Sequence, residues 1–214
     1  MILERIYSII DSVGILKEVS FEFQNAKFYY ITVETEKIGS YLFDCIGLVS
    51  PIMEGKFIID DIDISSLSYK EKAAIRRKNI GFIFKNILLD PDSNVFDNIM
   101  LPLVNDKSLN KQEKKAKVTK LLVEYNMSEL ENKYPQDLSL YDKQRVSLLR
   151  AIVANPKFVI AYEPTELFRK EEEKKFYDLL KNLNNKGIGV IIITRKIKFP
   201  KYADEIYFYE NKFM

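Results

Sequence analysis

The 214-residue chain contains no histidine, a single cysteine and only seven glycines. Without histidine it can supply neither an imidazole base nor a histidine metal ligand. Cys45 alone excludes an internal disulfide, and seven glycines leave little material for a glycine-rich phosphate loop. No apolar run approaches the roughly 20 residues of a membrane span. Charged residues among the first apolar ones, such as Glu4 and Arg5, argue against a signal peptide.

Apolar residues make up 47% of the chain, enough to bury a sizeable core, and the length fits one large domain or two small ones. The 33 basic and 31 acidic residues nearly cancel and leave a net charge of +2. So small a charge gives no strong attraction to nucleic acid or to an anionic membrane. We therefore expect no nucleic-acid partner, and we interpret Arg76, Arg77 and Lys78 as a solvated face.

Short apolar runs alternate with helical patterns, which predicts an α/β fold with a largely parallel sheet. The runs are continuous, as is typical of strands that are buried on both faces. They cover residues 28–33, 56–60, 79–85, 158–162, 188–194 and 206–209. Two apolar stripes with the spacing i, i+3, i+4, i+7, beginning at Val118 and at Phe176, predict amphipathic helices with charged outer faces.

Residues 134–165 read YPQDLSLYDKQRVSLLRAIVANPKFVIAYEPT. This stretch resembles the signature helix and Walker B strand of the ATP-binding cassette (ABC) ATPases, whose pattern is LSGGQ, QR, ANPK, four apolar residues and DEPT. Residues 45–56 resemble the helix and turn after a Walker A loop, and residues 76–84 resemble the strand that enters the Q-loop. Residues 98–103 resemble the ENVELPL segment of the lipoprotein-release and macrolide-export subfamily. The resemblance covers most of the chain, from about Ile15 to Met214.

This resemblance implies a single ABC ATPase domain over residues 1–214, of the P-loop NTPase-like α/β class. Residues 1–85 and 151–214 would form the α/β core, with a mostly parallel sheet and an antiparallel β portion near the N-terminus. Residues 86–150 would form the helical signature subdomain.

The expected phosphate loop has lost its motif. Such a loop needs GxxxxGK[ST], because small residues let backbone N–H groups surround the phosphates while lysine reaches the β and γ oxygens. The equivalent residues, 33–40, read VETEKIGS. Val33 and Ile38 replace the two glycines and Gly39 replaces the lysine, whereas Ser40 keeps the hydroxyl of the Mg²⁺-ligand position. We interpret Ser40 first as a helix cap and second as a metal ligand.

Two carboxylates also stand where polyphosphate should lie. Glu34 and Glu36 would repel a phosphate by roughly 1 to several kcal/mol. A shift of one residue would bring Lys37 nearer to the phosphate without restoring the glycines. We therefore expect no nucleotide to bind here in the usual way. An ion pair of Lys37 with Glu34 or Glu36 could close the loop without a ligand.

The other positions that the resemblance assigns to nucleotide contact are changed as well. In chain order, Lys85 replaces the Q-loop glutamine, Leu140 and Tyr141 the signature glycines, Tyr162 the Walker B aspartate, Arg169 the D-loop aspartate, and Arg195 the switch histidine. Ser139 of the signature and Glu163 at the catalytic-carboxylate position are retained. We interpret Glu163 first as part of a turn at the strand end, with residual catalysis as the alternative, since water activation also needs the metal and the phosphate clamps.

These losses suggest a non-catalytic pseudo-ATPase subunit, structural or regulatory, at the inner, cytoplasmic face of a membrane export complex. Residues 84–103 keep the family's shape where relatives dock on a permease, so the candidate docking residues are Lys85, Asn86, Leu88, Leu89 and Phe96. A second, intact ABC ATPase subunit or another copy of this chain would be a further partner. No metal or other cofactor is expected. The alternatives are an ATP-binding subunit with a rearranged site that takes Mg-ATP, and a soluble interaction module.

Overall fold

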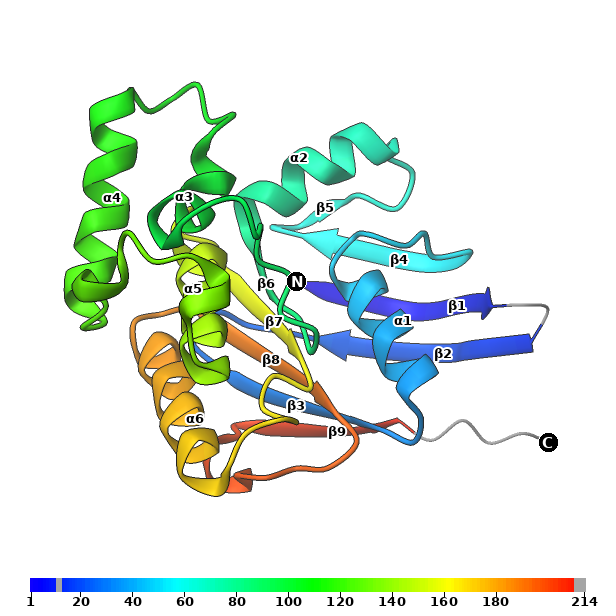
Figure 1. Cartoon of the computed structure of the whole chain (residues 1–214). Coiled ribbons are helices and arrows are strands. Elements are labelled where there is room, and N and C mark those ends of the chain that lie inside the picture. Colours follow the sequence, from blue (N-terminus) through cyan, green and yellow to red (C-terminus); the bar gives the residue numbers. More distant parts are fainter. Residues whose placement is uncertain (11–12, 210–214) are drawn as a thin grey trace.

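Two β-sheets form the centre of the structure, a computed structural model that describes residues 1–10 and 13–209 (Figure 1). The larger sheet is parallel and has the strand order β6-β7-β8-β3-β9; the smaller is antiparallel and has the order β2-β1-β4-β5. The strands are β1 (Ile2–Ile10), β2 (Val13–Glu22), β3 (Phe28–Val33), β4 (Glu54–Ile59), β5 (Ile62–Asp63), β6 (Ile80–Ile83), β7 (Phe158–Tyr162), β8 (Gly189–Thr194) and β9 (Glu205–Tyr209).

The parallel sheet confirms the α/β prediction, and its strands are the continuous apolar runs. Every residue of β7 and β8 is buried, as expected for strands that are covered on both faces. The run at 56–60 is an exception, because it lies in β4 and pairs antiparallel with β1. The predicted strand is present, and Phe57 and Ile59 are buried, but Lys56 and Asp60 are exposed, so the strand is not covered on both faces. The antiparallel portion near the N-terminus is present as predicted.

The helices are α1 (Glu36–Ile46), α2 (Tyr69–Asn79), α3 (Val95–Met100), α4 (Lys111–Glu124), α5 (Leu140–Ile152) and α6 (Lys170–Asn185). The two predicted apolar stripes lie in α4 and α6, where Val118 and Phe176 are fully buried. Between β6 and β7 the described elements are all helical, and Figure 1 shows α3, α4 and α5 at the end of the molecule away from β1, β2 and β4. No helix within the described ranges has the length and apolar character needed to cross a bilayer.

The parallel sheet separates two hydrophobic cores, because successive side chains of a strand point to opposite faces. Tyr29 and Ile31 of β3 join the core that contains α1 and the antiparallel sheet. Phe28 and Tyr30 of the same strand join the core that contains α3 to α6. The carboxyl ends of the parallel strands are therefore held firmly from both sides.

The segment that leads from β6 to α3 is fixed by one buried amide. Asn98 of α3 is fully buried, and its Oδ1 accepts a hydrogen bond from the Asp90 N–H at 2.8 Å. Its Nδ2 donates to the carbonyls of Asp90, Ser93 and Asn94 at 2.9 to 3.1 Å. A loop that has no sheet partner thus obtains its backbone hydrogen bonds from one side chain.

Replacing Asn98 by alanine should lower the free energy of unfolding by about 2 kcal/mol or more, because buried backbone groups lose their partner. Urea denaturation followed by circular dichroism measures this change. Asn105→Ala is the matched control, since Asn105 is exposed and should be near neutral. Equal stability of the two variants would contradict this account of Asn98.

Candidate functional site

The residues assigned to nucleotide contact gather at one edge of the parallel sheet. Strands β3, β6, β7 and β8 end at Val33, Ile83, Tyr162 and Thr194, and the candidate residues follow directly after these ends. The carboxyl edge of a parallel sheet is where open α/β folds bind ligands. The residues that the sequence predicted as a site therefore lie together at the edge of the sheet where such folds bind ligands.

A phosphate loop is not formed at this edge. Strand β3 ends at Val33 and α1 begins at Glu36, so only Glu34 and Thr35 connect them. The Oγ1 of Thr35 caps α1 by accepting a hydrogen bond from the Ile38 N–H at 3.3 Å. Residues 37–40, expected in the loop, lie in the helix instead.

Ser40 has a different role from the one expected. Its Oγ donates a hydrogen bond to the Lys37 carbonyl at 3.2 Å, within α1. The prediction that Ser40 caps this helix was wrong, because the helix begins one turn earlier, at Thr35.

Tyr162 and Gly39 fit together as a large and a small residue. The Tyr162 ring lies so close to Gly39 that a β-carbon built on Gly39 would stand 2.6 Å from its Cε2. The Tyr162 hydroxyl donates to the Glu36 carbonyl at 3.1 Å and so ties β7 to the start of α1. The two positions where the family places an aspartate and a lysine thus hold one packed contact.

Five charged side chains form a continuous series across this edge, which we call the ion-pair chain: Glu36, Lys85, Glu166, Arg195 and Glu163. Lys85 Nζ lies 2.7 Å from Glu36 Oε1 and 2.8 Å from Glu166 Oε2. Arg195 NH2 lies 2.6 Å from Glu166 Oε1, and Arg195 Nε lies 3.3 Å from Glu163 Oε1. Glu36 thus has a cationic partner in Lys85. The expected pairing of Lys37 with Glu34 or Glu36 stays a prediction.

Both oxygens of the Glu163 carboxylate accept hydrogen bonds. Oε2 accepts from the Thr194 hydroxyl at 2.9 Å, and Oε1 accepts from the Arg195 N–H at 2.7 Å. The side chain is 6% exposed, so little of it faces solvent. Its backbone has a φ of 41°, an uncommon left-handed conformation for a residue with a β-carbon. Glu163 thus joins the ends of β7 and β8.

Opposite charges set the electrostatics of the ion-pair chain. The hydrogen bond from Lys85 lowers the pKa of the Glu166 carboxyl, and the charges of Lys85 and Arg195 act in the same direction. The pKa of Lys85 is raised, first by Glu166 and then by Glu36. The ion-pair chain thus alternates three carboxylates with two cationic side chains.

The signature residues are engaged within the protein. Ser139 caps α5, where its Oγ accepts from the Asp142 N–H at 3.1 Å. The Tyr141 ring packs edge-on against Phe168, with 5.6 Å between the centroids. Gln144, fully buried, donates through Nε2 to the carbonyls of Phe84 and Pro164 and joins α5 to the segments after β6 and β7.

The side chains at this edge do not match the donors that Mg²⁺ and a polyphosphate require. A Mg²⁺ ion needs free carboxylate oxygens and a polyphosphate needs a ring of N–H donors. Here the carboxylates already have partners, the loop is two residues long and Tyr162 stands at the metal-ligand position. Across residues 1–10 and 13–209 no group of three or more metal-ligating side chains comes together.

The five candidate docking residues divide into two groups. Asn86 is exposed, and Leu88 is 60% exposed. Leu89 and Phe96 are partly buried and pack against the core that contains α3 to α6, and Lys85 belongs to the ion-pair chain. Their role in docking stays a prediction.

Sequence reasoning missed two residues of this site. Glu166 was not singled out, because its pairing with Lys85 depends on two strand ends that are distant in the sequence. Thr35 carried a signal that was available: a threonine followed by an acidic residue is a typical helix start. Because residues 33–40 were assigned to the phosphate loop, Thr35 was not considered as a helix cap.

The fold is that of the ABC ATPase class. Residues 16–166 match the family model described as ABC transporter, and the chain belongs to this family. It is 32% identical over 195 residues to the lipoprotein-releasing system ATP-binding protein LolD of Buchnera aphidicola, covering 90% of this chain and 84% of LolD. It is 28% identical to the macrolide export ATP-binding/permease protein MacB of Bdellovibrio bacteriovorus, of which it covers 29%.

A solved structure gives the same result at the level of the fold. The dimeric, post-hydrolysis structure of the ATP-binding cassette MJ0796, bound to ADP and Pi, superposes with a TM-score of 0.85 at 26% sequence identity. The match covers 97% of this chain and 94% of that chain.

Replacing Gly39 by alanine tests the contact with Tyr162. We expect a loss of about 1 kcal/mol in unfolding free energy, because the clash of roughly 1–3 kcal/mol exceeds the helix-propensity gain of about 1 kcal/mol. In a Tyr162→Leu background the ring atom that clashes is absent, so the same change should stabilise. Chemical denaturation of the four proteins gives this double-mutant cycle. A destabilisation of equal size in both backgrounds would refute the contact.

Acidification tests the ion-pair chain. Because the pKa of Glu166 is lowered from 4.5 in the folded state, its contribution to stability is present above that pH and is lost as the pH falls below it. At pH 7, Glu166→Gln should therefore be less stable than the parent by about 1 kcal/mol, and the difference should shrink in acid. Urea denaturation of both proteins at pH 7 and in acid measures this difference in stability. Glu129→Gln, an exposed site on another element, is the control; a constant difference for Glu166→Gln would speak against the pairing.

Proposed function

We propose that the chain is a non-catalytic, pseudo-ATPase subunit of an ABC-type membrane export complex. The observation that carries this proposal is the ion-pair chain, which joins the ends of β6, β7 and β8 to the start of α1 at the edge where a nucleotide would bind. Lys85 and Arg195 neutralise carboxylates that would otherwise require a metal ion.

Binding of Mg-ATP would have to reverse several interactions together. The two-residue connection would have to open by unwinding the start of α1, which Thr35 caps and the Tyr162 hydroxyl anchors. Glu36 would then face the phosphates, and Glu163 would have to release Thr194 and Arg195 before it could act on water. Each step costs hydrogen bonds or ion pairs that the free protein already has.

The family and the exposed surface support the proposal of a structural or regulatory role at the membrane. LolD and MacB are named for lipoprotein release and macrolide export, and we place this chain likewise at the cytoplasmic face of a permease. Leu88, Leu101 and Val104, which are 60%, 44% and 57% exposed, follow β6 on the helical side of the molecule. Contiguous exposed apolar patches mark docking surfaces, and we propose that these side chains contribute to one. The dimer of the MJ0796 cassette suggests that a second ABC subunit, identical or intact, pairs with this one.

Calorimetric titration with Mg-ATP tests the proposal. We expect no saturable binding in the micromolar range and no phosphate release above the buffer rate, because no phosphate loop is formed. The MJ0796 cassette, whose structure contains ADP and Pi, is the positive control. Micromolar binding together with turnover that Glu163→Gln abolishes would overturn the proposal and favour a rearranged active site.

A further inference from the structure

Helix α2 is fixed at its two ends but packs loosely along its length. A capping box joins Ser68 and Glu71 at its N-terminus, and at its other end the Asn79 Nδ2 donates to the Ile75 carbonyl at 2.9 Å. Asn79 is the one residue of α2 that is buried. The apolar residues in the middle of the helix are two alanines and one isoleucine. These short side chains leave the space beside the helix unfilled.

Cavities therefore adjoin α2 on both sides. One of about 350 Å³ lies between α2 and the hairpin of β4 and β5, and one of about 450 Å³ lies between α2 and the segment before α4. Ala74 and Lys78 line both, so the two cavities meet across the helix at these side chains. A further cavity of about 390 Å³ lies toward β6 and α5 and shares Arg77 with the second one.

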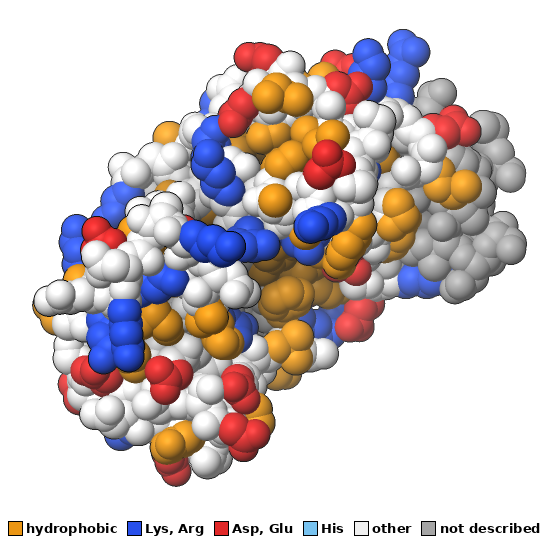
Figure 2. All heavy atoms as spheres, turned by 90° about the horizontal axis from the view of Figure 1, so that it is seen from above, with side chains coloured by type: hydrophobic (Ala, Val, Ile, Leu, Met, Phe, Trp, Pro, Cys, Tyr) orange, Lys and Arg blue, Asp and Glu red, His pale blue; other side chains and the backbone are white. Residues whose placement is uncertain are grey.

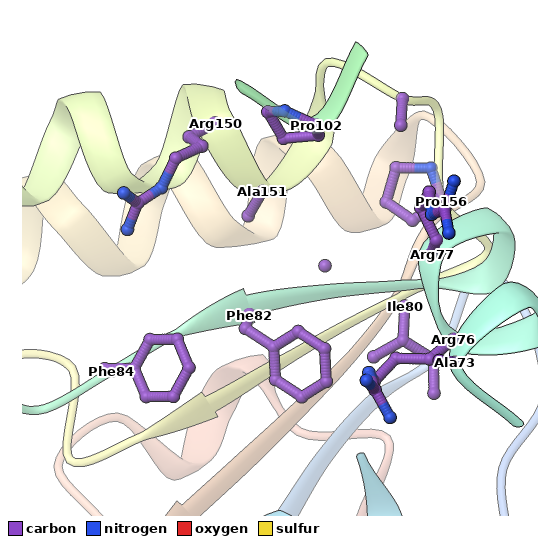
Figure 3. A pocket seen from close by; sticks show the side chains of 12 residues that line it. Ala73, Arg76, Arg77, Ile80, Phe82, Phe84, Pro102, Arg150, Ala151 and Pro156 are labelled. Atoms are coloured by element: carbon purple, nitrogen blue, oxygen red, sulfur yellow. The ribbon is translucent and has the colours of Figure 1, made fainter. Parts of the chain in front are cut away.

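The figures show how these cavities open to the surface. Seen from above, this side of the molecule is hollowed, with hydrophobic side chains at the base of the hollow and basic side chains around its rim (Figure 2). Arg77 lies at the α2 end of the cavity of about 390 Å³, at the opposite end from Arg150 (Figure 3). The guanidinium of Arg77 is thus placed on the side of α2 that faces away from the hairpin.

The cavity beside the hairpin has an apolar base, and we call it the apolar groove. Ile59 and Ile64 are buried beneath it, whereas Ile62 at its rim is 64% exposed. Leu67 and Ile75 complete the apolar part of the lining with Ala74. A hydrocarbon chain in this groove would cover apolar surface that water now reaches.

The polar residues of the apolar groove favour a hydrocarbon chain over a peptide. They are Asp60, Lys78 and Asn79. Asp60 already pairs with Lys157, and the Asn79 amide already donates within α2. A peptide would leave backbone N–H and C=O groups without partners against the isoleucines, and such groups are costly to bury. Lys78 remains for a negative charge at one end of the chain.

Basic side chains gather on the other side of α2. Arg77, Lys78 and Lys107 line the cavity of about 450 Å³, and all three are exposed. Within residues 1–10 and 13–209 the side chains of these three form neither a hydrogen bond nor an ion pair. Asp106 is the acidic residue of the lining, and its carboxylate accepts hydrogen bonds from Ser108. The excess of positive charge attracts an anionic group to this cavity.

We propose that the apolar groove and this basic cavity together bind an acidic amphiphile, that is, a hydrocarbon chain with an anionic head group. The chain lies on Ile59 and Ile64 and passes over the methyl group of Ala74, and the head group pairs with Lys78 and Arg77. A fatty acid and an acidic phospholipid share this chemistry. The site is separate from the ion-pair chain, so the proposal goes beyond the non-catalytic assignment.

Titration with cis-parinaric acid, a fluorescent fatty acid, tests the apolar groove. We expect saturable binding to the full chain. Ala74→Leu should weaken this binding at least about 10-fold, because the larger side chain fills the point where the two cavities meet. Leucine and alanine both favour helices, so the variant should fold, which circular dichroism checks. Ala116→Leu, at an exposed position of α4, is the matched control and should bind like the parent protein.

Competition against the same probe by dodecanoate and by dodecanol tests the basic cavity. Lys78→Gln should weaken the competition by dodecanoate about 3-fold, the effect of an exposed ion pair, and should leave dodecanol unchanged. Raised salt should weaken dodecanoate alone. Lys115→Gln, which removes an equal charge from an exposed position of α4, should change neither. Equal effects of Lys78→Gln on the acid and on the alcohol would overturn the assignment of the head group.

Flotation with vesicles distinguishes the two sources of the ligand. Flotation with phosphatidylglycerol vesicles but not with phosphatidylcholine vesicles, reduced by Ala74→Leu, identifies a membrane lipid. Competition by dodecanoate without flotation identifies a free fatty acid. The proposal is overturned if the probe does not bind saturably and no vesicle floats the protein, or if Ala74→Leu binds like the parent. None of these measurements involves nucleotide, so their failure is distinguishable from a failure of the non-catalytic assignment.

Discussion

Three carboxylates, those of Glu36, Glu163 and Glu166, meet at the carboxyl edge of the parallel sheet, and each needs a positive charge nearby. Without one, their mutual repulsion would push the start of α1, which carries Glu36, away from the segment after β7, which carries Glu163 and Glu166. Lys85 and Arg195 supply that charge from within the chain. The ion-pair chain therefore holds the ends of β6, β7 and β8 against the start of α1 without any bound ligand.

The replaced residues at this edge depend on one another. Lys85 pairs with Glu36 and Glu166, and Arg195 pairs with Glu166 and Glu163. The Tyr162 ring fits because position 39 is glycine. The Tyr162 hydroxyl and the Thr35 cap both require that α1 begin early. Such agreement between separate substitutions indicates a structure that is stable in its altered form. It also explains why restoring one family residue alone would leave the others in conflict.

Local patterns were sufficient to predict the sheet, the stripes of α4 and α6 and the edge where the site lies. They were not sufficient for the contacts within that edge. Lys85 and Glu36 are 49 positions apart, and Arg195 and Glu163 are 32 apart, so their pairing depends on the strand order of the folded sheet. Glu36 was recognised as a charge that repels phosphate and as a candidate partner of Lys37, but its pairing with Lys85 was not predicted. The early start of α1 was missed because the motif was aligned without a gap, and the burial of Leu89 and Phe96 depends on distant helices.

The two charged regions of the molecule differ in how their charges are satisfied. At the carboxyl edge, acidic and basic groups neutralise one another, and a ligand would have to displace existing partners. In the cavity of about 390 Å³ between α2, β6 and α5, Arg77 and Arg150 lie beside the rings of Phe82 and Phe84 without any carboxylate of the described chain to pair with them. A site gains most from a ligand when its own groups are desolvated and unpaired, since binding then adds interactions without breaking others. By this criterion that cavity would gain more from a ligand than the carboxyl edge of the sheet, where the charges are already paired.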